Sequence, residues 1–192
     1  MKTLTIHSVK EEHFLKLRLD TYKLTFDDGL FSQYFYWPII RRLETEKIFF
    51  ISTNLIGIEG ERRKKWNNDE FQEFPDCFEA LEDFRQTENR ENYMRVSELW
   101  DLIDDEATII VGGHGHNHIK YYNLHDQMRK DIEDMLEWFN KYLHMRPIHY
   151  AFPHYEQPFA LIKMLKEYGF QKLYGAWRIE IEEEINLLSY VR

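Results

Sequence analysis

The chain alternates short apolar runs with longer segments in which apolar residues recur at helical spacing. The short runs have the length and β-rich composition of buried strands, and they lie at residues 22–26, 48–51, 107–111, 148–152, 170–174 and 185–191. Two parallel strands need a crossover connection between them. The alternation of strands and helices therefore predicts a parallel α/β fold.

The segments between these runs have recognisable helix signals. Residues 32–46 keep a helical spacing of apolar positions, although Pro38 interrupts the first turns. Asp76 and Glu79 have the spacing of a capping box at the start of a further helix. The remaining predicted helices cover residues 77–84, residues 124–143 with one apolar face, and residues 157–168 between Pro158 and Gly169.

Composition fits a single domain over residues 1–192, with a polar, charged insertion at about residues 53–93. The chain is 43% hydrophobic, which is enough for one sizeable core. A formal net charge of -9 disfavours nucleic acid and anionic membranes as partners, because both require a basic face. The lone Cys77 allows no intramolecular disulfide. The N-terminus lacks the apolar core of a signal peptide and no run approaches the length of a membrane span, so a cytoplasmic protein is expected.

Two polar segments follow predicted strands and contain residues that bind metals. The first is Asp27-Asp28-Gly29, and the second is His114-Gly115-His116-Asn117-His118. Successive side chains of an extended segment point to opposite faces, so one aspartate can bind a metal while the other takes a proton from the metal-bound water. The two outer histidines lie on one face if their loop opens into a helical turn. Zinc accepts such ligands, and three protein ligands leave a position for water. Taken singly, an ordinary turn and a solvated histidine loop remain alternatives.

These segments resemble the motifs of the polysaccharide deacetylases of the NodB-homology type, carbohydrate esterase family 4. Residues 24–29 match the first motif of that family, residues 113–118 are similar to the second, and residues 150–154 are similar to the strand that ends in its aromatic-Pro-Tyr element. Residues 94–102 resemble the short helix before the second motif. The resemblance covers about residues 20–178 and implies a distorted, incomplete (β/α) barrel of about seven strands.

The resemblance also implies roles for the polar residues. Asp27 takes the position of the catalytic base, while Asp28, His114 and His118 take those of the metal ligands, with Zn²⁺ the expected ion. The activity implied is metal-dependent removal of acetyl groups from a carbohydrate. In this reaction, backbone N–H groups near Pro153 and His154 would help to hold the oxyanion.

Further candidates surround this predicted site. His154 stands where the family has tyrosine, so it is a candidate catalytic residue, and a structural loop histidine is the alternative. Trp177 is a candidate wall for a sugar ring, with a core position as the alternative. The predicted substrate-binding residues are Phe152, Pro153, Trp177 and His116.

Two features of active family members are missing from the sequence. Ala151 stands about where the family has an arginine that orients the base, and no histidine follows His154. The nearest match to the late Leu-x-x-His is residues 187–190, which makes Tyr190 a candidate acid although an ordinary tyrosine is a poor one near neutral pH. The alternatives are therefore a family member that binds a carbohydrate or metal without turnover, and a hydrolase of a small amide on the same fold.

Overall fold

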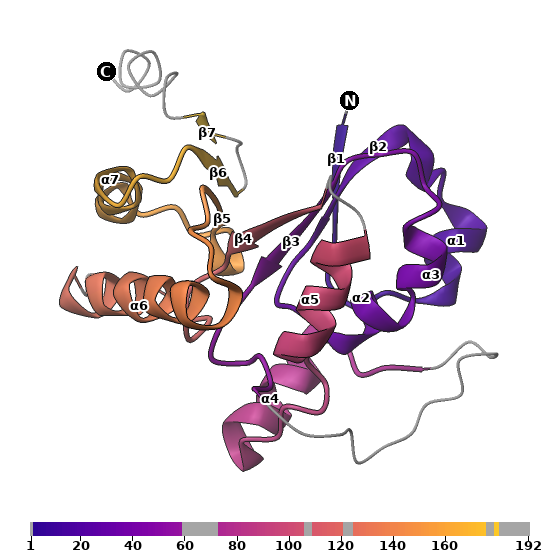
Figure 1. Ribbon diagram of the computed structural model, residues 1–192, viewed down its shortest axis with the longest axis horizontal. Helices are drawn as coiled ribbons and strands as arrows, with labels where there is room; N and C mark the ends of the chain where they lie inside the picture. Colours follow the sequence, from indigo (N-terminus) through magenta and orange to yellow (C-terminus); the bar gives the residue numbers. More distant parts are fainter. Residues whose placement is uncertain (1, 59–72, 106–108, 121–124, 176–178, 181–192) are drawn as a thin grey trace.

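The structure is a computed structural model that describes residues 2–58, 73–105, 109–120, 125–175 and 179–180 (Figure 1). The predicted strand at residues 185–191 lies outside these residues. In the described part of the chain, no helix is both long and apolar enough to cross a membrane.

One seven-stranded sheet organises the fold, and its spatial order follows the sequence order from β1 to β7. Strands β1 to β6 are parallel, and β7 pairs antiparallel with β6. This curled sheet with its helices confirms the predicted distorted, incomplete (β/α) barrel. The strands are β1 (Lys2–Ile6), β2 (Tyr22–Phe26), β3 (Lys47–Ile51), β4 (Ile110–Gly113), β5 (His149–Ala151), β6 (Lys172–Tyr174) and β7 (Ile179–Glu180).

The strand at residues 22–26 is the second strand and not the first, because Lys2–Ile6 forms β1 beside it. The residues of β1 alternate between polar and apolar from Thr3 on, and Ile6 is its buried residue. Such a short edge strand has no continuous apolar run, which is why the apolar pattern did not predict it.

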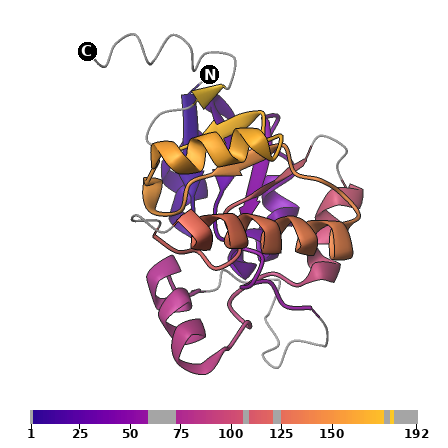
Figure 2. The same ribbon diagram turned by 90° about the vertical axis from the view of Figure 1, so that its left-hand side faces the viewer.

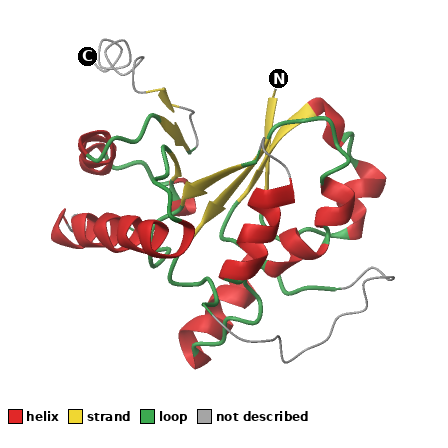
Figure 3. Cartoon of the chain, in the orientation of Figure 1, coloured by secondary structure: helices red, strands yellow, loops and turns green. Residues whose placement is uncertain are grey.

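Helices cover the outer face of the curled sheet (Figures 1 and 3). Helices α6 and α7 lie side by side against one part of the sheet, as the view in Figure 2 also shows. The helices are α1 (Glu11–Lys16), α2 (Phe31–Phe35), α3 (Trp37–Ile40), α4 (Cys77–Thr87), α5 (Val96–Asp105), α6 (His125–Trp138) and α7 (Phe159–Glu167), with short helical segments η1 (Leu19–Thr21), η2 (Phe139–Leu143) and η3 (Pro153–Tyr155).

The helix signals in the sequence are confirmed. The segment that Pro38 interrupts divides into α2 and α3, and α6 with its π-helical continuation η2 covers the long amphipathic pattern. Helix α4 has the predicted capping box, in which Glu79 N donates to Asp76 Oδ1 at 3.0 Å and Asp76 N donates to Glu79 Oε2 at 2.9 Å. The resemblance to a short helix before the histidine loop corresponds to α5.

The two faces of the sheet have different surroundings. Phe49 and Ile51 of β3 belong to the large core that the outer helices complete, whereas Ile48 and Phe50 belong to a smaller cluster with Ala151 and Tyr174 on the inner face. Because side chains alternate along a strand, inner-face residues point into the interior of the incomplete barrel. The loops at the carboxyl ends of the parallel strands, where such folds carry their sites, therefore lie around the mouth of this interior.

Candidate active site

The Asp27-Asp28-Gly29 turn follows β2 directly and buries both carboxylates. Asp27 is 5% exposed and Asp28 is 4% exposed. Asp28 and Gly29 have left-handed backbone conformations, with φ of 71° and 77°. A Cβ on Gly29 would lie 2.7 Å from Ile56 Cδ1, so both the conformation and the close contact require glycine. The left-handed backbone at Asp28 makes this segment a turn and not the extended segment expected from the sequence, so strand alternation does not account for the different surroundings of the two carboxylates.

The histidine loop follows β4 and buries His114 and His118. The prediction that this loop opens into a helical turn is wrong. His118 is brought back toward His114 instead by left-handed backbone at Gly115, with φ of 76°, and at His118 itself, with φ of 51°. The resulting ring centroids lie 5.0 Å apart.

Asp131 of α6 holds this loop through three hydrogen bonds. Its carboxylate accepts hydrogen bonds from His116 N at 2.8 Å and from Asn117 N and Nδ2, both at 2.9 Å. Asp131 is buried, and three donors compensate the cost of burying its charge. No sequence pattern indicated this residue, since a carboxylate inside an amphipathic helix pattern gives no signal of what it binds.

Asp28, His114 and His118 converge on one point. Asp28 Oδ1 lies 3.3 Å from His114 Nε2 and 3.0 Å from His118 Nε2. Despite these short distances, the buried Asp28 Oδ1 has no hydrogen-bond partner of acceptable geometry among the described residues. His114 Nδ1 lies 2.9 Å from the carbonyl oxygen of Ala151, which can only accept, so Nδ1 carries the proton and Nε2 presents its lone pair. One carboxylate and two imidazoles, of which His114 has a supported tautomer, fit a divalent cation such as zinc.

The two aspartates differ in electrostatics. Burial raises the pKa of Asp27 above its usual value, an effect that the nearby histidines only partly oppose. Burial acts in the same direction on Asp28, but the adjacent His114 and His118 imidazoles outweigh it and hold the pKa of Asp28 well below its usual value. Asp28 is thus the carboxylate held ionised among the histidines, and Asp27 is the one with greater proton affinity.

His7 is a residue at this site that no sequence pattern predicted. Its Nε2 lies 4.0 Å from Asp27 Oδ2, and its side chain is about one-third exposed. The signal that could have identified His7 is its place directly after a strand, because His7 follows β1 as Asp27 follows β2. The sequence pattern did not predict β1, so this place could not be recognised.

The predicted insertion also reaches the site. His7, Asp28 and Cys77 present possible ligand atoms within 4.8 Å of one another, and Cys77 is the first residue of α4. Burial, followed by the neighbouring Asp28 charge, raises the pKa of the Cys77 thiol to about 11. Ser8 Oγ donates to Pro75 O at 2.9 Å, which ties the segment before α4 to the end of β1. Residues 75–77 of the predicted insertion therefore lie close to Asp28 and to the end of β1.

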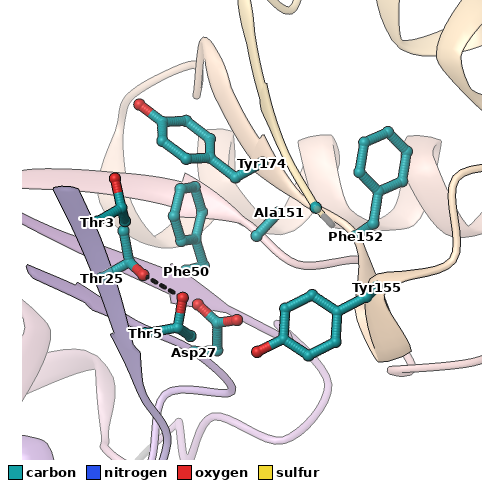
Figure 4. Close-up of a pocket in the computed structure, with 10 residues that line it drawn as sticks. Thr3, Thr5, Thr25, Asp27, Phe50, Ala151, Phe152, Tyr155 and Tyr174 are labelled. Carbon is teal, nitrogen blue, oxygen red and sulfur yellow. Dashed lines mark hydrogen bonds between the residues drawn. The ribbon is translucent and has the colours of Figure 1, made fainter. Parts of the chain in front are cut away.

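The loop after β5 brings two further residues to the site. His154 and Tyr155 both have φ of 57°, and the His154 ring lies 4.6 Å from the ring of His118. The Tyr155 hydroxyl points toward Asp27 (Figure 4) and lies near enough to Thr5 and Asp27 for both to affect the pKa of Tyr155, which burial raises. Tyr155 was not predicted, because the family's tyrosine comes one residue earlier.

The predicted oxyanion donors need one correction. Pro153 has no backbone N–H, and the Phe152 N–H donates to Tyr174 O at 2.8 Å. Of the backbone donors predicted for the oxyanion, the His154 N–H therefore remains a candidate. The His154 ring is half-buried beside the histidine loop. Burial and the neighbouring His118 lower the pKa of this imidazole.

Of the other predicted site residues, some lie at the site and others do not. Phe152 lines the pocket beside Asp27, and Pro153 is buried at the start of η3. His116 turns away, with its Nδ1 2.7 Å from Thr53 Oγ1, and burial lowers its pKa. Trp177 and Tyr190 lie outside the described residues, so their roles stay predictions.

A pocket of about 250 Å³ begins at Asp27 and extends into the barrel interior (Figure 4). One wall consists of threonines from β1 and β2, and the other consists largely of aromatic side chains. The lining residues are Thr3, Thr5, Thr25, Asp27, Phe50, Ala151, Phe152, Tyr155, Tyr174 and Gly175.

Comparison with known proteins agrees with this geometry. The family model described as polysaccharide deacetylase matches residues 17–173, which is most of the chain. The chain belongs to the polysaccharide deacetylase family. Among curated proteins no match is found.

Solved structures of polysaccharide deacetylases have the same fold as this family member. A polysaccharide deacetylase from Bacillus cereus superposes with a TM-score of 0.61 at 11% identity, over 94% of this chain and 60% of that chain. IcaB from Ammonifex degensii superposes with a TM-score of 0.57 at 13% identity, over 97% of this chain and 82% of that chain. A family 4 pseudoenzyme from Bacillus anthracis superposes with a TM-score of 0.51 at 12% identity, over 79% of this chain and 42% of that chain. At these identities the likeness concerns the fold alone.

Proposed function

We propose that this deacetylase-family chain is a metal-dependent hydrolase that removes an acyl group, such as acetyl, from a carbohydrate. The observation that carries the proposal is the convergence of Asp28 Oδ1 with the Nε2 atoms of His114 and His118, at 3.3 and 3.0 Å, next to a second buried carboxylate. This ligand set suits Zn²⁺, and the adjacent Asp27 supplies the base that hydrolysis requires.

Asp27 would act on the attacking water. A divalent cation held by Asp28, His114 and His118 supplies Lewis acidity toward the acyl oxygen and that water. Asp27 has a buried Oδ1 without a hydrogen-bond partner in the described part of the chain, so this oxygen is available to take the proton. The water oxygen then forms a bond to the acyl carbon, and the bond from that carbon to the sugar nitrogen or oxygen breaks.

The leaving group needs a proton, and His7 is in position to give it. Its imidazole is beside Asp27 and open to solvent on one side, which suits a group that passes a proton to a departing amine. His7 would thereby take the acid role for which His154 and Tyr190 were the candidates in the sequence. The His154 N–H and the Tyr155 hydroxyl are the donors available for the developing oxyanion.

A second candidate function is carbohydrate or metal binding without turnover. Ala151, in place of the arginine implied by the resemblance, favours it, because a methyl group cannot orient the base. His7 offers Asp27 a different partner, and for this reason we place hydrolysis first.

The test is acetate release from N-acetylated and O-acetylated oligosaccharides by the zinc-loaded protein and by the chelated protein. We expect one bound metal per chain and release that depends on it. Bound metal without release from either substrate would favour the second candidate, and a protein that binds no divalent metal would contradict the proposal.

A further inference from the structure

The pocket beside Asp27 is deeper than an acetyl group requires. Lys23 of β2 pairs with Thr3 of β1, and Asp27 follows four residues after Lys23. At about 3.3 Å per residue, this separation along the strands is about 13 Å. Thr3 and Asp27 both line the pocket, so it extends from the base into the barrel interior over a distance of that order.

The pocket's volume leads to the same conclusion. A cavity of about 150 Å³ holds benzene, which has six heavy atoms. The pocket beside Asp27 measures about 250 Å³, whereas an acetyl group has three heavy atoms. The available space therefore accommodates a chain several carbons longer than acetyl.

The pocket's two walls differ in chemistry. Thr5 and Thr25 are partners in register, and their hydroxyls hydrogen-bond to each other at 2.9 Å. The interior of a barrel is usually filled by bulky branched apolar residues, and threonines leave more room and present hydroxyls. Opposite them lie the rings of Phe50 and Tyr174, which contact each other with centroids 4.9 Å apart. An alkyl chain would pack on the rings while a polar substituent would face the threonines.

Charge favours a neutral group as the ligand. Asp27 is the charged residue among those that line the pocket, and its charge is negative. Lys23 lies beside the pocket, since its Nζ is 3.5 Å from the hydroxyl of the lining residue Tyr174, but its charge is already paired with Glu46. Among the described residues that line the pocket, none is a cation, so a neutral acyl group fits it better than an acidic one.

We propose that this pocket is an acyl-chain site, and that the group removed by the enzyme is a neutral acyl chain longer than acetyl, of about four to six carbons. The inference rests on the proposed hydrolysis and specifies its substrate class. In the reaction, water adds to the acyl carbon, the bond from that carbon to the sugar nitrogen or oxygen breaks, and the chain leaves as a carboxylic acid.

The experiment compares aryl esters and N-acylated glucosamine oligosaccharides that carry acetyl, butyryl and hexanoyl groups, using the zinc-loaded protein. After correction for spontaneous hydrolysis, we expect kcat/KM to rise about tenfold from acetyl to butyryl, as burial of two methylene groups allows. Butyrate should also inhibit more strongly than acetate, which reports binding separately from turnover. Turnover of acetyl substrates alone would overturn this inference and leave the proposed function standing, whereas absence of turnover at every length would overturn both.

A filled pocket gives a second, structural test. Thr3→Trp places a large ring at the exposed end of the pocket, and we expect the ratio of butyryl to acetyl kcat/KM to fall to about one. Lys2→Trp is the matched control, because Lys2 is the exposed neighbour on the same strand and its side chain points to the other face. An unchanged ratio in a folded Thr3→Trp protein would contradict the inference. If that variant does not fold, the comparison of butyrate with acetate inhibition of the unaltered protein decides.

Discussion

His7 and Asp27 occupy equivalent positions at the ends of two hydrogen-bonded strands, and His7 Nε2 lies 4.0 Å from Asp27 Oδ2. The register that pairs Ile6 with Phe26 places these next residues side by side at the carboxyl edge of the sheet. Two segments twenty residues apart in sequence thus form the acid–base pair of the proposed mechanism.

His7→Ala should slow the hydrolysis of N-acyl substrates by about two to four orders of magnitude, the usual effect of a positioned acid. The hydrolysis of esters with good leaving groups should slow much less in this variant, because these leaving groups need no proton. The measurement is kcat/KM for an N-acyl sugar and an aryl ester, side by side. His125→Ala, at the exposed start of α6, is the control and should match the unaltered protein. Equal losses on both substrates would show that His7 acts in another way.

Asp28→Ala and His118→Ala should each release the metal and leave the domain folded. Both side chains lie at the carboxyl edge of the sheet, outside the apolar core that stabilises the domain. Elemental analysis of the purified variants measures metal content, and circular dichroism reports folding. His116→Ala is the matched control, since its ring bonds Thr53 and not Asp28. Full metal occupancy in either ligand variant would refute the assignment.

Asp27→Asn should keep the metal and lose activity by about two to four orders of magnitude, because the amide retains the shape of the carboxylate but accepts no proton. Metal content and hydrolysis are measured on the same preparation. Loss of the metal in this variant would mean that the roles of Asp27 and Asp28 are reversed.

Asp131→Ala should destabilise the protein by about 1–3 kcal/mol for each buried donor that it leaves unpaired. It should also weaken metal binding by about 10–100-fold, since the loop that carries His114 and His118 loses its support. Denaturant unfolding and metal titration measure the two effects. Asp134→Ala on the same helix removes an exposed pair with Lys130, 2.9 Å long, and should change stability by less than about 1 kcal/mol. A metal affinity unchanged by Asp131→Ala would contradict the role in loop support.

Local signals in the sequence predicted much of this fold. The apolar run at residues 48–51 became β3, and the Asp76 and Glu79 pair capped α4 as predicted. These features depend on neighbouring residues, so periodicity and capping chemistry are sufficient to find them. The family motifs likewise identified Asp27, Asp28, His114 and His118 as one group, which the structure brings together.

The tertiary structure decided which other residues join that group. His7, Tyr155, Cys77 and Asp131 reach it from β1, η3, α4 and α6, and none of them stands in a local pattern that reports its neighbours. Strand register sets the position of His7, while left-handed backbone sets those of His118 and Tyr155. The sequence by itself determined most of the described strands and helices, because these depend on local periodicity, and its family motifs indicated the candidate metal ligands. The proposed acid His7, the Asp131 contacts to the histidine loop and the pocket beside Asp27 depend on long-range packing, which becomes defined only when the sheet curls.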